Sequence, residues 1–251
     1  MPTFKPCCPF PPKKLKWKQI APFLGEAREA VARLDEKWDK PLFLELLFWH
    51  EAIASLRTQN IERSLKEVLL YAFANRSDDQ SEPFLQKILL VKEALDEALD
   101  WGLKRVLGQR FFCHLHGIVK RDGAKPSDIG RIRNRQNWIG RPGCSIEDAY
   151  FCPPSAAEVR PLLRNLEEYL QKKGIDPLVQ TAIAFAQFLI IHPFMDGNGR
   201  VARIFIPMFA MKRGLLSHPV LLLSFYFAEH RKDYFQKLFH LTTKESWEDT
   251  F

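Results

Sequence analysis

The sequence predicts an all-α fold with one β-hairpin placed ahead of its most buried helix. Its 251 residues are 46% apolar and 27% charged, a balance typical of globular proteins. Apolar residues recur at three- and four-residue spacing along most of the chain, which is the pattern of amphipathic helices. No internal repeat interrupts that pattern. This length is sufficient to bury a core without disulfide bonds.

The first half of the chain is predicted to form an irregular arm followed by helices. Residues 1–14 carry five prolines and two cysteines, so no regular element is expected there. The apolar periodicity then predicts helices over residues 26–38, 42–57, 64–74, 83–101 and 111–119.

The hairpin is expected within residues 130–152. Asn137-Trp138-Ile139 and Ala149-Tyr150-Phe151 contain the aromatic and β-branched residues that favour strands. They flank a stretch that contains Gly and Pro, which favours a turn between them.

Two helices with clear boundaries follow the hairpin. Ser155 and Glu158 have the spacing of a capping box, and the helix that they begin is expected to close at Gly174. Asp176 can cap the next helix, and Pro177 can take its first position. Few polar residues follow, so this helix is expected to be central and buried.

The charge balance is a weak indication of nucleic-acid binding. Thirty-seven Lys and Arg face thirty Asp and Glu, which gives a formal net charge of +7. The densest basic run covers residues 13–18, and elsewhere basic and acidic residues alternate along helical faces, as they do on ordinary solvated surfaces. No nucleic-acid-binding motif accompanies the charge, so nucleic acid is not expected as a partner.

Cysteine usage and hydropathy indicate the compartment. The five cysteines form no Cys-x-x-Cys pair, which favours a reduced intracellular protein over a zinc or redox site. The first residues lack the apolar stretch of a signal peptide, and no run approaches the roughly 18 apolar residues of a membrane span. A cytoplasmic protein without a membrane partner is therefore expected, with export by a specialised route left open.

The segment IHPFMDGNGRVARIF, residues 191–205, carries the chemistry. Gly197, Asn198 and Gly199 lie where a loop passes into a helix, so their N–H groups can converge on an anion. His192 precedes a proline at the end of the buried helix, where an imidazole with a pKa of about 6.5 suits a general base.

Charged residues complete the same segment. Asp196 offers a hard oxygen ligand for Mg²⁺ bridged to phosphates. Arg200 and Arg203 lie three residues apart on one helix face, where both can bind phosphate oxygens.

HPFMDGNGR followed by VAR resembles the signature of the Fic family, H-x-F-x-[D/E]-G-N-G-R-x-x-R, and every specified position is met. Residues from about 45 to 240 are similar to the family pattern. The resemblance implies a Fic-type helical bundle with a β-hairpin flap. It places the N-terminal helical region, with an inhibitory helix, in residues 1–90 and the catalytic core in residues 91–251.

The resemblance also implies an activity, a protein adenylyltransferase that moves AMP from ATP onto a Ser, Thr or Tyr hydroxyl of a protein, the chain itself included. The residues that it implies are His192 as base, Asp196 for Mg²⁺, Gly197, Asn198 and Gly199 as the anion hole, Arg200 and Arg203 for the outer phosphates, and Phe194 holding the loop in the core. The flap would hold the target by strand addition through Gln136, Asn137, Trp138, Ile139 and Gly140. Tyr226 and Phe227 are candidates for adenine contact or, equally, core aromatics.

One departure from the family pattern concerns regulation. Residues 55–60 fit the inhibitory motif [S/T]-x-x-x-E-[G/N] with Ser55 and Asn60, but Gln59 stands at the glutamate position. An amide cannot form the ion pair by which that glutamate blocks the second arginine, so weakened autoinhibition is expected. A second alignment, which we favour less, uses Thr58 and Glu62, with Arg63 at the last position.

Three alternatives remain open at this stage. One is a hydrolase that removes AMP, which in this family tends to need the regulatory glutamate. The second is phosphoryl transfer with the nucleotide reversed, seen in relatives with altered anion loops, whereas Gly199 is intact here. The third is a non-catalytic nucleotide-binding module. A homo-oligomer is left open, and the family pattern leads us to expect more chain after Phe251.

Overall fold

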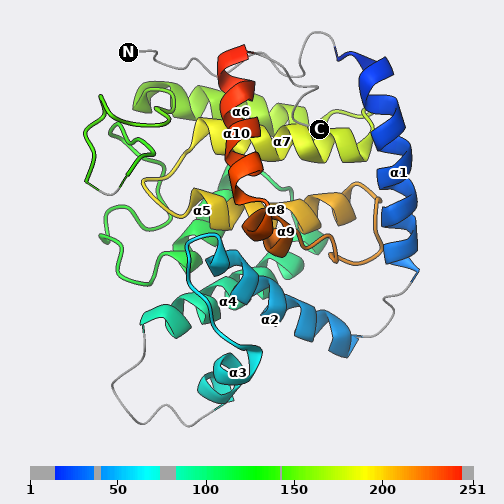
Figure 1. The fold of residues 1–251 in the computed structure, drawn as a ribbon, viewed down its shortest axis with the longest axis horizontal. Coiled ribbons are helices and arrows are strands. Elements are labelled where there is room, and N and C mark those ends of the chain that lie inside the picture. Colours follow the sequence, from blue (N-terminus) through cyan, green and yellow to red (C-terminus); the bar gives the residue numbers. More distant parts are fainter. Residues whose placement is uncertain (1–14, 37–40, 74–82, 142, 245–251) are drawn as a thin grey trace.

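A computed structural model describes residues 15–36, 41–73, 83–141 and 143–244, which form ten α-helices (Figure 1). The helices are α1 (Trp17–Asp35), α2 (Pro41–Arg57), α3 (Leu65–Phe73), α4 (Pro83–Lys104), α5 (Gln109–Val119), α6 (Ala156–Gln171), α7 (Pro177–Ile191), α8 (Asn198–Lys212), α9 (Ser224–Glu229) and α10 (Arg231–Lys244). The predicted all-α class is confirmed. The predicted arm, residues 1–14, lies outside the described residues.

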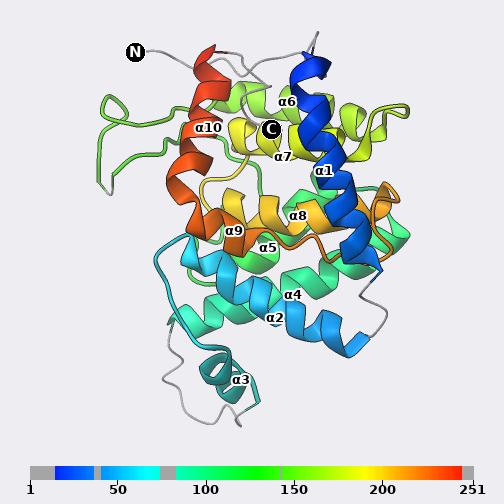
Figure 2. The same cartoon turned by 45° about the vertical axis from the view of Figure 1, so that its right-hand side comes forward.

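The helices are stacked in layers around α7 and α8. In both views α6 and α7 lie at one end of the molecule, α8 lies in the middle, and α4 and α2 lie beyond it (Figures 1 and 2). Nearly every residue of α7 from Val179 to Ile191 is buried, as predicted for the central helix. The loop from α7 to α8 therefore starts in the middle of the core, and residues 192–197 are anchored at both ends by buried helices.

Local sequence signals explain where α6 and α7 begin. The Ser155 N–H donates to Glu158 Oε2 at 3.0 Å, and the two side chains complete the capping box. Asp176 Oδ1 accepts the N–H groups of Leu178 and Val179 at 3.0 and 3.1 Å. Both predicted caps are confirmed, although α6 ends at Gln171, ahead of Gly174.

The first helix differs from its prediction. It begins at Trp17 rather than near residue 26, because Pro22 is tolerated inside it. The helix is held along its length by the rest of the protein: Val31 packs against Ala210 and Val220, and Asp35 accepts the Ser217 N–H at 2.7 Å. Tertiary contacts thus stabilise a helix whose start local propensity does not favour.

The predicted hairpin is only partly formed. Within the described residues no strand is present, and the two arms meet at a single antiparallel bridge between Ile139 and Phe151. The Ile139 N–H donates to the Phe151 carbonyl at 2.8 Å. Beyond the bridge the backbone turns on itself, as in the bond from the Cys144 N–H to the Arg141 carbonyl at 3.0 Å. These local hydrogen bonds use backbone N–H and C=O groups that further pairing between two strands would require.

The boundary proposed between residues 90 and 91 falls inside α4, a continuous helix that packs against α2, α5 and α8. One hydrophobic core extends from Phe48 on α2 to Leu241 on α10. The division into two regions stays a prediction. In the described part of the chain, no helix combines the length and apolar character needed to cross a bilayer.

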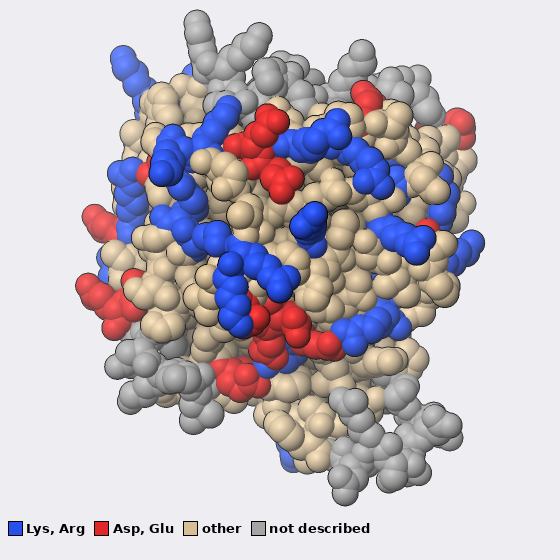
Figure 3. Space-filling model, turned by 180° about the vertical axis from the view of Figure 1, so that it is seen from behind, with Lys and Arg blue, Asp and Glu red and all other residues tan. Residues whose placement is uncertain are grey.

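Charge on the surface is mixed. On the face shown in Figure 3, Lys and Arg side chains lie interspersed with Asp and Glu. Elsewhere in the described residues Arg135 pairs with Asp128 at 2.7 Å, and such mixed charges are the pattern of a solvated surface.

Candidate active site

A cleft of about 1520 Å³ lies where α2, α7, α8, α10 and the flap meet. Segments far apart in the sequence line it. They include Thr58, Gln59, Ile139, Gly140, His192, Asp196, Gly197, Asn198, Gly199, Arg200, Arg203, Phe227, Arg231 and Tyr234. The structure thus brings the predicted motif together with part of the flap and with the predicted regulatory residue Gln59.

His192 caps the C-terminal end of α7 in a left-handed conformation, with φ at 50°. Its Nδ1 lies 3.2 Å from the Leu189 carbonyl, which can only accept a hydrogen bond, so Nδ1 carries the proton. Nε2 is then left with its lone pair. Burial lowers the pKa of His192 to about 4, although the bond to Leu189 works to raise it. The imidazole is neutral at physiological pH and can accept a proton.

Arg133, from the segment before the flap, fixes the backbone at His192. Its Nε donates to the His192 carbonyl at 2.9 Å, and its other nitrogens bond the carbonyls of Arg135 and Pro154. The Arg133 guanidinium is buried, and burial lowers its pKa. One side chain, that of Arg133, therefore connects the backbone at His192 with the segments on both sides of the flap.

The loop after His192 is closed by Asn198. The Phe194 N–H donates to Asn198 Oδ1 at 2.9 Å, and Asn198 Nδ2 donates to the Phe194 carbonyl at 2.8 Å. The same carbonyl accepts Asn137 Nδ2 at 2.8 Å. The Phe194 ring is fully buried and stacks on His116, with centroids 4.0 Å apart. The loop conformation is consequently specified twice, by hydrogen bonds and by packing.

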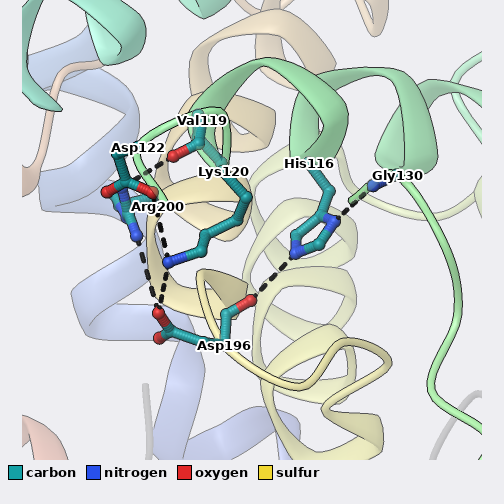
Figure 4. Close-up of polar contacts among 7 residues, drawn as sticks. All are labelled: His116, Val119, Lys120, Asp122, Gly130, Asp196 and Arg200. Carbon is teal, nitrogen blue, oxygen red and sulfur yellow. Dashed lines mark hydrogen bonds and ion pairs between the residues drawn. The ribbon is translucent and has the colours of Figure 1, made fainter. Parts of the chain in front are cut away.

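His116 on α5 was not predicted from the sequence. The Gly130 N–H donates to its Nδ1 at 3.0 Å, so the proton is on Nε2, which donates to the Asp196 carbonyl at 3.0 Å (Figure 4). Burial lowers the pKa of His116 to about 4, against that same hydrogen bond. A neutral His116 thus joins α5, the chain before the flap and the loop.

The residues predicted to bind an anion lie at the N-terminal end of α8. Gly197 caps the helix with φ at 80°, and helical bonding begins with the Val201 N–H to the Gly197 carbonyl at 3.1 Å. The N–H groups of Asn198, Gly199 and Arg200 precede that bond and have no partner within the helix. A Cβ on Gly199 would lie 3.0 Å from a terminal nitrogen of Arg203, so glycine also leaves room for that arginine.

Asp196 and Arg200 belong to a charge cluster (Figure 4). Lys120 Nζ lies 2.7 Å from Asp196 Oδ2 and 3.3 Å from Asp122 Oδ1. Arg200 donates to the Val119 carbonyl at 2.8 Å and to Asp122 Oδ2 at 3.3 Å. Burial works to raise the pKa of Asp196, but the Lys120 hydrogen bond and charge outweigh it and lower that pKa to about 2. Arg200 is therefore already bonded within the protein, which the motif does not indicate.

Asp196 fits a magnesium ion that arrives with phosphates. Its side chain is 70% exposed, and the described residues contain no cluster of three or more His, Cys, Asp or Glu side chains that would hold a metal unaided. Mg²⁺ commonly binds through one or two carboxylates together with substrate phosphates and water.

Arg203 is held by α2, the predicted inhibitory helix. Its Nε and one terminal nitrogen donate to the Ser55 hydroxyl at 3.2 and 2.9 Å, and that terminal nitrogen also donates to the Ser55 carbonyl at 2.9 Å. Glu51, one turn earlier, is buried and accepts a hydrogen bond from the Ser224 hydroxyl. Burial raises the pKa of Glu51, whereas the hydrogen bond from Ser224 and the charge of Arg203 work to lower it. Gln59 lines the cleft but makes no hydrogen bond to Arg203 within the described residues.

The end of α2 favours the alignment that places Gln59 at the glutamate position. Asn60 adopts a left-handed conformation with φ at 61°, which Gly and Asn tolerate best. The Ile61 N–H closes the turn on the Leu56 carbonyl at 3.2 Å, as in a Schellman motif. Glu62 is exposed and does not line the cleft. The preference for Gly or Asn after the regulatory position thus has a conformational cause.

Some predicted site residues lie outside the cleft. Tyr226 is 56% exposed and does not line it, whereas Phe227 does and packs on Tyr234, with ring centroids 4.7 Å apart. In the flap, Ile139 and Gly140 face the cleft. Gln136, Asn137 and Trp138 instead bond the chain around them, as Gln136 Nε2 does to the Pro153 carbonyl at 2.9 Å.

Sequence reasoning gave no role to five residues that contact motif residues directly or through one another. These are His116, Lys120, Asp122, Glu51 and Ser224. No spacing links them to the motif, and the helical pattern alone makes His116 a core residue and Lys120 a surface residue. Their contacts could be found only after α5 and α2 were placed against α8.

Comparisons with known proteins agree with this geometry. Residues 107–210 match the Fic/DOC family model. A protein adenylyltransferase, fic-1 of Caenorhabditis elegans, is 32% identical over 167 residues, which cover 64% of this chain and 27% of that protein. A probable protein adenylyltransferase of Aquifex aeolicus is 40% identical over 73 residues, 29% of this chain and 23% of that protein. The chain thus spans about a quarter of the length of these relatives.

Solved structures share the fold. A Fic family protein from Desulfovibrio desulfuricans G20 superposes with a TM-score of 0.76 at 22% identity, covering 96% of this chain and 71% of that one. Residues 134–508 of Fic-1 from C. elegans superpose with a TM-score of 0.66 at 18% identity, covering 92% of this chain and 69% of that one.

Proposed function

Because the chain belongs to the Fic/DOC family and is homologous to protein adenylyltransferases, we propose that it transfers AMP from ATP to a hydroxyl side chain of a protein. The observation that carries this proposal is the neutral His192, with Nε2 free to accept a proton, in one cleft with the open N-terminal end of α8. A base and an anion site are the two parts that attack at phosphorus requires.

The reaction follows from these positions. His192 Nε2 takes the proton of the target hydroxyl as its oxygen attacks the α-phosphorus of ATP. The bond from that phosphorus to the bridging oxygen breaks, and pyrophosphate leaves with its electron pair. The N–H groups at the start of α8 stabilise the charge on the phosphates. Asp196 would hold Mg²⁺, which supplies further charge neutralisation when bound.

Two further surfaces complete the proposal. We assign contact with the adenine ring of ATP to Phe227 and Tyr234, which both line the cleft, in preference to the exposed Tyr226. We assign target docking to the flap near Ile139 and Gly140, where an extended segment can lie along the backbone and reach His192.

The test is intact-protein mass spectrometry after incubation with ATP and Mg²⁺, with and without a cell lysate as a source of targets. We expect AMP adducts with the unaltered chain and a loss of about 10² to 10⁴-fold in rate with His192→Ala. His114→Ala is the matched control, because His114 does not line the cleft and contacts Glu97 and Trp101 among the described residues. ATP binding without any adduct would instead indicate a non-catalytic nucleotide-binding module.

We also propose that autoinhibition is weakened in this chain. Arg203 bonds Ser55, and the neutral Gln59 offers it no ion pair. Gln59→Glu restores a carboxylate at the cleft edge and should lower the transfer rate, whereas Gln171→Glu, on an exposed residue at the end of α6, should not. Equal rates in Gln59→Glu and the unaltered chain would contradict the proposal. If Gln59→Glu instead removes AMP from a modified protein, the hydrolase activity would be favoured for relatives that have a glutamate at this position.

A further inference from the structure

Lys120 has no place in the signature motif, yet its ammonium group lies inside the charge cluster formed with Asp122, Asp196 and Arg200 (Figure 4). Its Nζ is 2.7 Å from Asp196 Oδ2. Arg200 also approaches that oxygen, at 3.8 Å. The Asp196 carboxylate, which would bind a metal ion, is therefore already paired with the ammonium group of Lys120.

The burial of the four side chains shows which of them are fixed. Asp122 and Arg200 are each 2% exposed and Lys120 is 12% exposed, whereas Asp196 is 70% exposed. Asp122 lies 3.3 Å from both cations, so it holds both of them beside Asp196. Buried charges persist only when paired, and this sharing keeps the ammonium in place.

The stem of Lys120 also contacts the anion site. A Cβ at Gly197 would lie 3.1 Å from Lys120 Cδ, so the side chain runs directly past the residue that caps α8. The stem of Lys120 thus passes the start of α8, and its ammonium group ends on the carboxylate of Asp196.

We propose that Lys120 is a built-in counter-cation for Asp196 that takes over part of the electrostatic role of the divalent cation in nucleotide binding. This inference rests on the proposed function. Without a metal, the charges of a triphosphate are repelled by Asp196, and Lys120 cancels that repulsion. When a divalent cation binds Asp196, the same repulsion is already cancelled, and the contribution of Lys120 shrinks. The chain consequently binds nucleotide with a reduced dependence on the metal.

The experiment measures the affinity for α,β-methylene-ATP, which cannot transfer AMP, by isothermal titration calorimetry in excess EDTA and in Mg²⁺. In Lys120→Met we expect the Kd in EDTA to rise about tenfold, because the repulsion between the Asp196 carboxylate and the triphosphate is no longer cancelled. The Kd in Mg²⁺ should change by less than about threefold, and Lys120→Arg should behave like the unaltered chain in both buffers.

Lys104→Met is the matched control, because Lys104 pairs with the exposed Asp100 on α4, whereas Lys120 pairs with Asp196. If Lys120→Met fails to fold, Lys120→Gln, which keeps Asp122 for Arg200 and has an amide that can still donate to the carboxylates, replaces it, and the same ratio of affinities is measured.

Equal weakening in EDTA and in Mg²⁺ would show that Lys120 acts independently of the metal and would overturn this inference alone. An unchanged Kd in both buffers would do the same. Failure of the unaltered chain to bind the nucleotide in Mg²⁺ would overturn the proposed function as well.

Discussion

The loop between α7 and α8 and the flap lie on two sides of one cleft and are built in different ways. In the loop, Phe194 is fully buried and both of its backbone polar groups bond Asn198. In the flap, Trp138 and Tyr150 are 42% and 56% exposed, and one bridge joins the arms. The groups proposed for chemistry are thus held on the core, while Ile139 and Gly140, which are proposed for target docking, lie in a segment with exposed aromatic side chains and one bridge.

The largest effect that would sharpen this comparison is loss of the Phe194 ring. Phe194→Ala should lower the free energy of unfolding by about 3–5 kcal/mol, because it leaves a cavity beside His116 and Phe188. Urea denaturation followed by circular dichroism measures this change. A loss below about 1 kcal/mol would mean that the loop is not supported by the core.

The second-largest effect is expected from acid, which should lower the free energy of unfolding through His116 beside the loop. The pKa of His116 is about 4 in the folded protein and about 6.5 when unfolded, so the unfolded chain binds more protons below pH 6.5. This histidine alone should cost about 2 kcal/mol of stability between pH 8 and pH 5. His116→Gln removes the titration while its amide can still donate to the Asp196 carbonyl, so the pH dependence of unfolding should decrease by that amount. An identical pH dependence in both proteins would contradict a neutral buried His116.

A smaller effect is expected where the two regions meet. Asn137 donates to the Phe194 carbonyl from the base of the flap, and Asn137→Ala should cost about 1 kcal/mol. Asn134→Ala, three residues earlier and exposed, should have almost no effect in the same denaturation experiment. Equal losses in the two variants would show that the flap is not joined to the loop by this bond.

The smallest effect is expected at the tip side of the flap. Trp138 is half-exposed and donates only to the Cys144 carbonyl at 3.0 Å. Trp138→Ala should change the free energy of unfolding by about 0.5 kcal/mol or less. A loss as large as that of Phe194→Ala would remove the distinction between the two regions.

The flap also shows where sequence reasoning was wrong. Aromatic and β-branched residues on both sides of a stretch with Gly and Pro predicted two strands, but nothing in that pattern shows that residues 143–149 form local backbone hydrogen bonds. Tyr226 and Phe227 were equivalent candidates in the sequence. Only the packing of Phe227 on Phe185, with ring centroids 5.3 Å apart, turned one toward the cleft and left the other exposed.

By itself the sequence determined the features that depend on neighbouring residues. These are the caps at Ser155 and Asp176, the buried character of α7, the glycine-rich start of α8 and the left-handed Asn60. The caps, the start of α8 and the conformation of Asn60 arise from hydrogen bonds and backbone preferences that act within about one helical turn, and the burial of α7 follows from its nearly continuous apolar sequence. Tertiary structure alone decided the pairing of Lys120 with Asp196 and of Arg203 with Ser55, because residues 76 and 148 positions apart meet only after the helices have packed into one core.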